Sequence, residues 1–241
     1  MNNITLVSTR HDKLGKCNSQ ELYSIFERVN PEVIFEEIPP SYFDKYYKSR
    51  TCINLETDTI NWYLEAHNIN HIPVDSDDVP SESFFSEYEA MLKSIEGITG
   101  VEGFHYRNII DTYRSNSEMY GFKYLNSIYC IILNDDIFSS IKKGLQKINK
   151  DKFFQTNELW KNVQEKRENE MLKNIYNYNK EHSYDKAIFT LGAAHRKSIM
   201  KKIREFEKKE QLKLNWTFYN EPFAERAPTG ASCSARSLDA I

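Results

Sequence analysis

The sequence predicts an α/β fold in which a central, largely parallel β-sheet is flanked by helices, with a helical insertion in the middle of the chain. Near both ends of the chain, short apolar runs that fit buried strands alternate with longer amphipathic segments at helical spacing. Between about residues 82 and 150, by contrast, apolar residues recur at helical spacing and no segment has a strand pattern. The 241 residues, 40% of them hydrophobic, suffice for one domain with a sizeable core.

The first two strands come from the N-terminal 38 residues. The apolar run 4–8 predicts a strand, and residues 19–29 form an amphipathic pattern that predicts a helix. Asn30-Pro31 ends this helix, and residues 33–38 predict a second strand. A strand, a compact helical crossover and a second strand predict parallel neighbouring strands.

The remaining elements follow from the same two periodicities. We expect helices at 56–68, 157–181 and 197–210, and strands at 72–75, 186–191 and 212–219, the last at a sheet edge. Residues 1–226 are predicted to form a single domain, in which about 82–150 is a helical insertion or cap. From residue 227 the composition changes to small and polar residues, so 227–241 is predicted to be disordered or introduced by cloning, and to add almost nothing to stability.

Composition argues against several classes of partner. The net charge of −3 gives no basic field for nucleic acid or an anionic membrane. The start of the chain lacks a secretory signal pattern, and the longest apolar stretch is far shorter than the ~20 residues that cross a bilayer. The four cysteines are scattered without metal-site or disulfide-scaffold spacing. We therefore expect a cytoplasmic protein whose partner is a small molecule or a peptide.

Three side chains at strand ends form the candidate site. His11 and His195 follow the first and fourth predicted strands, and Glu37 lies at the end of the second. In open α/β sheets, ligands bind beyond the carboxyl ends of the strands. Two imidazoles and a carboxylate suit a divalent metal ion that keeps positions open for water. Strand alternation places Glu36 on the sheet face opposite to Glu37.

Each of these residues also has a purely structural interpretation. A histidine after a strand is commonly a loop or capping residue, and Glu36 or Glu37 could cap a helix or pair with Arg50. Asp75, at the end of the third strand, is a weaker candidate that also fits a simple turn. The other histidines have no motif and are expected to be structural or exposed.

Four segments, taken in order, resemble a known family. Ser8-Thr9-Arg10-His11 and Gly192-Ala193-Ala194-His195 are similar to the two Gly-x-x-His motifs of the Tiki/TraB family of metallohydrolases. The segment 30–37 resembles that family's proline, acidic, apolar-run, glutamate segment, with Glu37 in the glutamate's place. The segment 166–171 resembles the Arg-Asn/Asp-x-x-Met helix of this family and of the erythromycin esterase-like proteins.

The resemblance implies a fold and a site. It implies that both His turns face one cleft, that His11, Glu37 and His195 act there, and that Arg167 turns toward it. In the membrane-anchored Tiki members this site goes with metal-dependent peptide cleavage, and in the esterase-like relatives with opening an ester by activated water. The first motif departs from the family, because Ser8 replaces its glycine, and we expect this to crowd the backbone.

The leading interpretation is a hydrolase of the peptidase or esterase type that uses an activated water. A metal held by His11, Glu37 and His195 would lower the pKa of that water. Without metal, His11 would act as general base, oriented by Glu36 or Glu37. Arg167 would steady the developing oxyanion or a substrate carboxylate, unless it forms an ion pair within its own helix.

Two alternatives use the same fold without catalysis: a carrier of a ligand such as haem, and a regulatory interaction domain. For the site itself, we expect the side chain of His195 to project into the cleft, so that truncating it removes no core packing.

Overall fold

The computed structural model describes residues 2–220. The first part of the chain gives β1 (Asn3–Thr9), α1 (Ser19–Val29), β2 (Val33–Glu36), η1 (Pro40–Tyr42), α2 (Phe43–Tyr47), α3 (Leu55–Ala66) and β3 (Asn70–Pro73). The middle is helical, with α4 (Glu82–Glu96), α5 (Val101–Tyr120), α6 (Phe122–Leu125), α7 (Ile128–Ile148) and α8 (Asp151–Glu181). The last part gives β4 (Lys186–Gly192), η2 (Ala193–His195), α9 (Arg196–Lys209) and β5 (Asn215–Phe218).

The five strands form one sheet in the order β3-β2-β4-β1-β5, and every pair is parallel. This confirms the α/β class and the parallel sheet, and β5 lies at an edge as predicted. The prediction that β1 and β2 are neighbours is wrong, because β4 lies between them and pairs with both. β4 is suited to this central position because its residues Ala187–Leu191 are all buried.

The strands bury different residues on the two faces of the sheet. Val33 and Phe35 pack with residues of α8 and α9, whereas Ile34 packs with residues of α1, α3 and α6. This alternation is the one predicted for β2. It directs Glu36 toward the α3 side and leaves Glu37, directly after the strand, on the α8 side.

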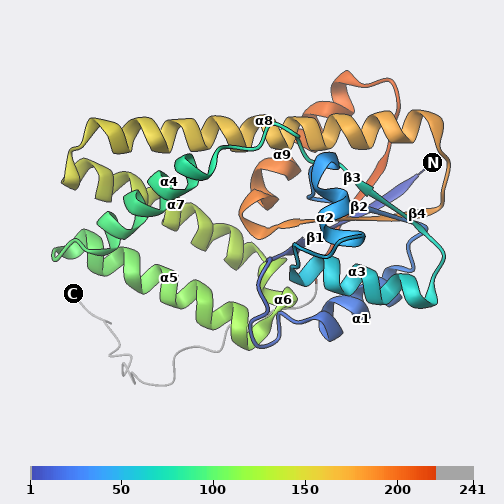
Figure 1. Ribbon diagram of the computed structural model, residues 1–241, viewed down its shortest axis with the longest axis horizontal. Helices are drawn as coiled ribbons and strands as arrows, with labels where there is room; N and C mark the ends of the chain where they lie inside the picture. Colours follow the sequence, from blue (N-terminus) through green and yellow to red (C-terminus); the bar gives the residue numbers. More distant parts are fainter. Residues whose placement is uncertain (1, 221–241) are drawn as a thin grey trace, which may run out of the picture.

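The helical insertion has a core of its own. Met91, Ile95, Tyr106, Ile141 and Leu145 bring together α4, α5 and α7 away from the sheet. Figure 1 shows these helices at one end of the molecule and the sheet at the other, with α8 running along both. The first turns of α8 pack on the insertion core, and its C-terminal half packs on the sheet. α8 therefore joins the two parts, and it begins six residues earlier than the periodicity predicts because this first segment packs on the insertion.

The sequence also predicts a tail without a packed core and no helix that crosses a membrane. The expected tail, residues 227–241, lies outside the described residues. Within residues 2–220, no helix has both the length and the apolar character needed to cross a membrane.

Candidate functional site

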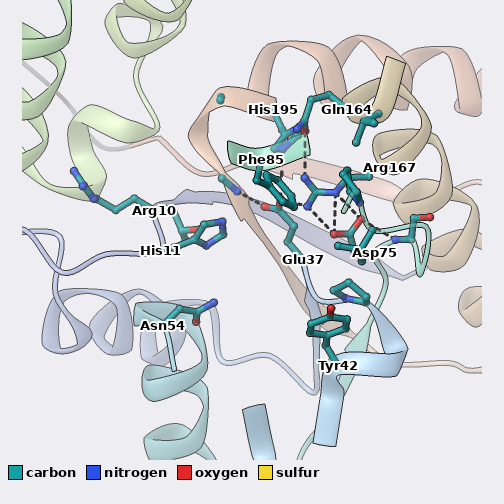
Figure 2. Close-up of a pocket in the computed structure, with 18 of the residues that line it drawn as sticks. Arg10, His11, Glu37, Tyr42, Asn54, Asp75, Phe85, Gln164, Arg167 and His195 are labelled. Atoms are coloured by element: carbon teal, nitrogen blue, oxygen red, sulfur yellow. Dashed lines mark hydrogen bonds and ion pairs between the residues drawn. The ribbon is translucent and has the colours of Figure 1, made fainter. Parts of the chain in front are cut away.

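A pocket of about 720 Å³ lies at the carboxyl ends of the central strands. β1, β4 and β2 are adjacent and parallel, so the loops that follow these three strands lie at the same edge of the sheet and border the pocket. Ligands bind at this edge, near a topological switch point, in open parallel sheets. Figure 2 shows the side chains that surround it. The polar and charged lining residues include Arg10, His11, Glu37, Asn54, Asp75, Gln164, Arg167 and His195.

The floor of the pocket is an ion-pair cluster centred on Arg167. Its Nη2 donates to Glu37 Oε1 at 2.7 Å and to Asp75 Oδ2 at 2.6 Å, and its Nε also donates to Asp75. Both carboxylates are buried. Arg167 thus pairs with residues that follow β2 and β3, rather than with Glu168 or Glu170 on its own helix. Asp75 is part of the site and not a simple turn residue.

His195 is held on both nitrogens by carboxylates. Nδ1 lies 2.8 Å from Glu168 Oε1, and Nε2 lies 3.4 Å from Glu37 Oε1. The residue is only 8% exposed. His195 therefore borders the pocket but does not project freely into it, and its truncation would remove one charged partner each from Glu37 and Glu168.

The charges of this cluster depend on one another. Burial alone lowers the pKa of His195, but Glu37 and Glu168 outweigh this and raise it to about 9. Burial likewise raises the pKa of Glu37, but the positive charges of His195 and Arg167 hold it well below its usual range. At neutral pH the cluster therefore contains the imidazolium of His195, the guanidinium of Arg167 and the ionised carboxylate of Glu37.

The paired charges predict how stability depends on pH. His195 binds its proton more tightly in the folded protein, so its contribution is complete below its ordinary pKa of 6.5 and is lost as the pH rises through about 9. The contribution of Glu37 is complete above its ordinary pKa of 4.5 and is lost as the pH falls. We expect Tm, measured by circular dichroism, to be highest between pH 4.5 and pH 6.5, where both contributions are complete, and to fall at lower and at higher pH. The variant His195→Asn should lose much of the alkaline fall, and a wild-type Tm that is flat from neutral pH to above pH 9 would contradict the assignment.

His11 belongs to a second, separate pair. Its Nδ1 lies 3.2 Å from Glu56 Oε1, and its side chain is 57% exposed. Glu56 is in the first turn of α3 and also accepts a hydrogen bond of 2.7 Å from the Thr9 hydroxyl. The Leu55 backbone N–H donates to the His11 carbonyl at 2.8 Å, which fixes the loop after β1 against the start of α3. The hydrogen bond with Glu56 is the main cause that raises the pKa of His11 to about 9.

Glu36 lies on the other side of the sheet from Glu37, as the alternation predicts. Its carboxylate interacts with His71 Nδ1 at 2.8 Å and accepts a hydrogen bond from the Tyr47 hydroxyl. It does not line the large pocket. Together with His11, Glu37 and Glu56 it borders a neighbouring cavity of about 10 Å³, which has room for about one water molecule.

The three predicted metal ligands do not fit a metal ion in this arrangement. Both nitrogens of His195 face carboxylates, and the two oxygens of Glu37 accept from Arg167 and from the Gly192 N–H. His11 pairs with Glu56 instead. In the described part of the chain, no group of three or more His, Cys, Asp or Glu side chains is placed to hold a metal ion. The structure thus brings Glu37, Arg167 and His195 into contact, and leaves His11 beside them in the same pocket.

Sequence reasoning missed two of the carboxylates. Glu56 is marked only by its place in the first turn of a helix, directly after the capping residue Asn54. Glu168 directly follows Arg167 in the sequence, and its place in the helix favours only an ion pair within that helix. Ser8 does not crowd the site, because it does not line the pocket and its hydroxyl accepts a hydrogen bond from Arg196.

Comparison with known proteins gives one structural similarity. No family model matches the sequence. No curated protein matches it. Among solved structures, a histidine-to-asparagine mutant of the erythromycin esterase EreC in its open conformation is similar over 78% of this chain, with 11% sequence identity and a TM-score of 0.36. This chain covers 60% of that chain, and at this TM-score the similarity assigns neither family nor activity.

Proposed function

We propose that this chain is a hydrolase that opens an ester or amide with a water molecule activated by His11, without a metal ion. The observation that carries the proposal is the His11–Glu56 pair at the edge of the large pocket. Nδ1 of His11 faces a buried carboxylate, and no side chain or backbone group among residues 2–220 forms a hydrogen bond with Nε2. This is the arrangement that a general base requires, with one nitrogen oriented and the other free to accept a proton.

The pair provides for both proton transfers. When Nδ1 of neutral His11 carries the proton and donates to Glu56, Nε2 can take a proton from water as the oxygen attacks the carbonyl carbon. Glu56 then stabilises the imidazolium that forms, and Nε2 can return the proton to the leaving group. Glu37 and Glu36, the expected orienting residues, are engaged elsewhere, so Glu56 takes this role.

Arg167 is the proposed stabiliser of the oxyanion. It lines the same pocket, and its side chain is 21% exposed. Glu37 and Asp75 fix the plane of its guanidinium, which presents a preorganised positive charge to the pocket. His195 keeps Glu37 in place and acts as a positioning residue.

The remaining walls indicate the substrate class. Apolar and aromatic side chains form much of the lining, namely Tyr42, Tyr46, Ile53, Val79, Phe85, Trp160 and Val163. We infer that the substrate is a small molecule or a peptide with an apolar body. The same wall favours a second candidate function, a non-catalytic carrier of an apolar ligand.

The pH profile of ester hydrolysis tests the proposal. We expect the full chain to hydrolyse 4-nitrophenyl esters in the presence of EDTA. Its kcat/KM should rise with pH around a midpoint of about 9, because His11 must lose its proton to act as base. In Glu56→Gln the midpoint should move down toward 6.5, the ordinary value for histidine, since the carboxylate that raises the pKa is gone.

The control for this experiment is Glu65→Gln, which removes an exposed carboxylate from the same helix and should leave the midpoint unchanged. A profile that EDTA abolishes would contradict the metal-free proposal. Tight binding of an apolar dye without any turnover would favour the carrier.

A further inference from the structure

Arg10 is a cation of the large pocket that has no partner among residues 2–220. It directly follows β1 and lines the pocket beside His11. Its Nε is buried, and within residues 2–220 neither Nε nor the terminal nitrogens form a hydrogen bond or an ion pair. Arg167 lines the same pocket, but Glu37 and Asp75 pair with its charge and Gln164 accepts one hydrogen bond from its Nη1.

The unpaired Nε of Arg10 is costly because it is buried, whereas the terminal nitrogens reach solvent and can bind a ligand from the pocket. A guanidinium offers five donors, and a buried donor that stays unpaired loses its hydration without compensation. The neighbours that respond to its charge are Cys17 and Tyr113, whose pKa values are raised by burial and lowered again in part by Arg10. Neither is an ionised partner at neutral pH, so Arg10 stays uncompensated by the chain around it.

The position of Arg10 relates it to the proposed chemistry. In Figure 2 its side chain extends away from the cluster of Glu37, Arg167 and Asp75, on the other side of His11. A ligand that reaches His11 from the pocket can therefore place one end near Arg10 and the other near the aromatic wall formed by Phe85 and Trp160.

We propose that Arg10 binds an anionic group of the substrate, so that the preferred substrate carries a carboxylate or a phosphate at one end and an apolar body at the other. The planar fork of the guanidinium suits both oxyanions, because each can accept two parallel hydrogen bonds. The part of this inference that concerns hydrolysis rests on the proposed function.

A matched pair of esters tests the inference in the full chain. The hydrogen glutarate ester of 4-nitrophenol carries a free carboxylate, and its methyl ester is the neutral counterpart. Arg10→Gln should raise KM for the charged ester about 10- to 100-fold, the range for a lost charge-assisted hydrogen bond, and change KM of the neutral ester by less than about twofold. Arg10→Lys should retain part of the preference, since it keeps the charge but loses the fork. The control Arg114→Gln removes an exposed arginine from α5 and should change neither KM.

A binding experiment separates this inference from the proposed function. Titration with glutarate and with glycerol phosphate, followed by tryptophan fluorescence because Trp160 lines the pocket, needs no turnover. If neither ester is hydrolysed but Arg10→Gln raises Kd for one of the anions at least about tenfold, the anion site stands without the hydrolase, and the tighter anion identifies the group. If Arg10→Gln alters charged and neutral esters equally, or leaves the anion Kd unchanged, the inference is overturned.

Discussion

Replacement of His11 by asparagine is expected to lower kcat/KM for an ester substrate by about 10²- to 10⁴-fold, the usual contribution of a positioned general base. The fold should be unaffected, because the side chain is more than half exposed and its ion pair with Glu56 is only partly shielded from water. The backbone contact from Leu55 to the His11 carbonyl does not depend on the side chain. Initial rates and a thermal unfolding curve on the same preparation measure both quantities.

The control for His11→Asn is His105→Asn, an exposed histidine on α5 outside the pocket. It should leave both the rate and Tm unchanged. A His11→Asn enzyme that keeps its rate to within a few-fold would remove His11 from the mechanism. A parallel loss of rate and stability would mean that His11 has a structural role.

Arg167→Met is expected to have the largest effect on stability, a loss of about 3–5 kcal/mol in the free energy of unfolding. The substitution keeps an apolar stem of similar length but leaves the buried carboxylates of Glu37 and Asp75 without their guanidinium. Unpaired buried charges are costly because they have lost their hydration. Urea unfolding monitored by circular dichroism gives the change directly.

Two further variants test that cause. Arg167→Lys keeps a charge and should lose less, and the double variant Arg167→Met with Asp75→Asn should recover part of the loss, since one unpaired carboxylate has been removed. A loss below about 1 kcal/mol for Arg167→Met would indicate that the cluster is solvated like a surface ion pair.

The elements of the fold could be predicted from sequence because their signals are local. The apolar run of β1 and the capped, amphipathic pattern of α1 each lie within about ten residues. The order of the strands could not be predicted in this way. Nothing within residues 4–38 indicates that β4, about 150 residues later, lies between β1 and β2.

The site shows the same limit. His11, Glu37, Arg167 and His195 could be proposed because strand ends and short motifs mark them. Their partners could not, since Glu56 and Glu168 are helix residues whose roles come only from packing across the sheet edge. For this reason the sequence suggested a ligand set for a metal, whereas in the structure His11 pairs with Glu56, and Glu37 and His195 pair with each other and with further charged groups.

Helix α8 contributes to the pocket from both parts of the molecule, since it packs on the insertion core and on the sheet core. Trp160, on the part of α8 beside the insertion, stacks against Phe84 and Tyr88 of α4, while Arg167, two turns later, binds carboxylates at the sheet. Part of the apolar lining, Phe85 and Trp160, thus packs with the insertion, whereas the charged cluster lies at the sheet, and the two parts have separate cores. Mutations in the insertion can therefore reshape this part of the pocket wall while leaving the charged cluster at the sheet intact.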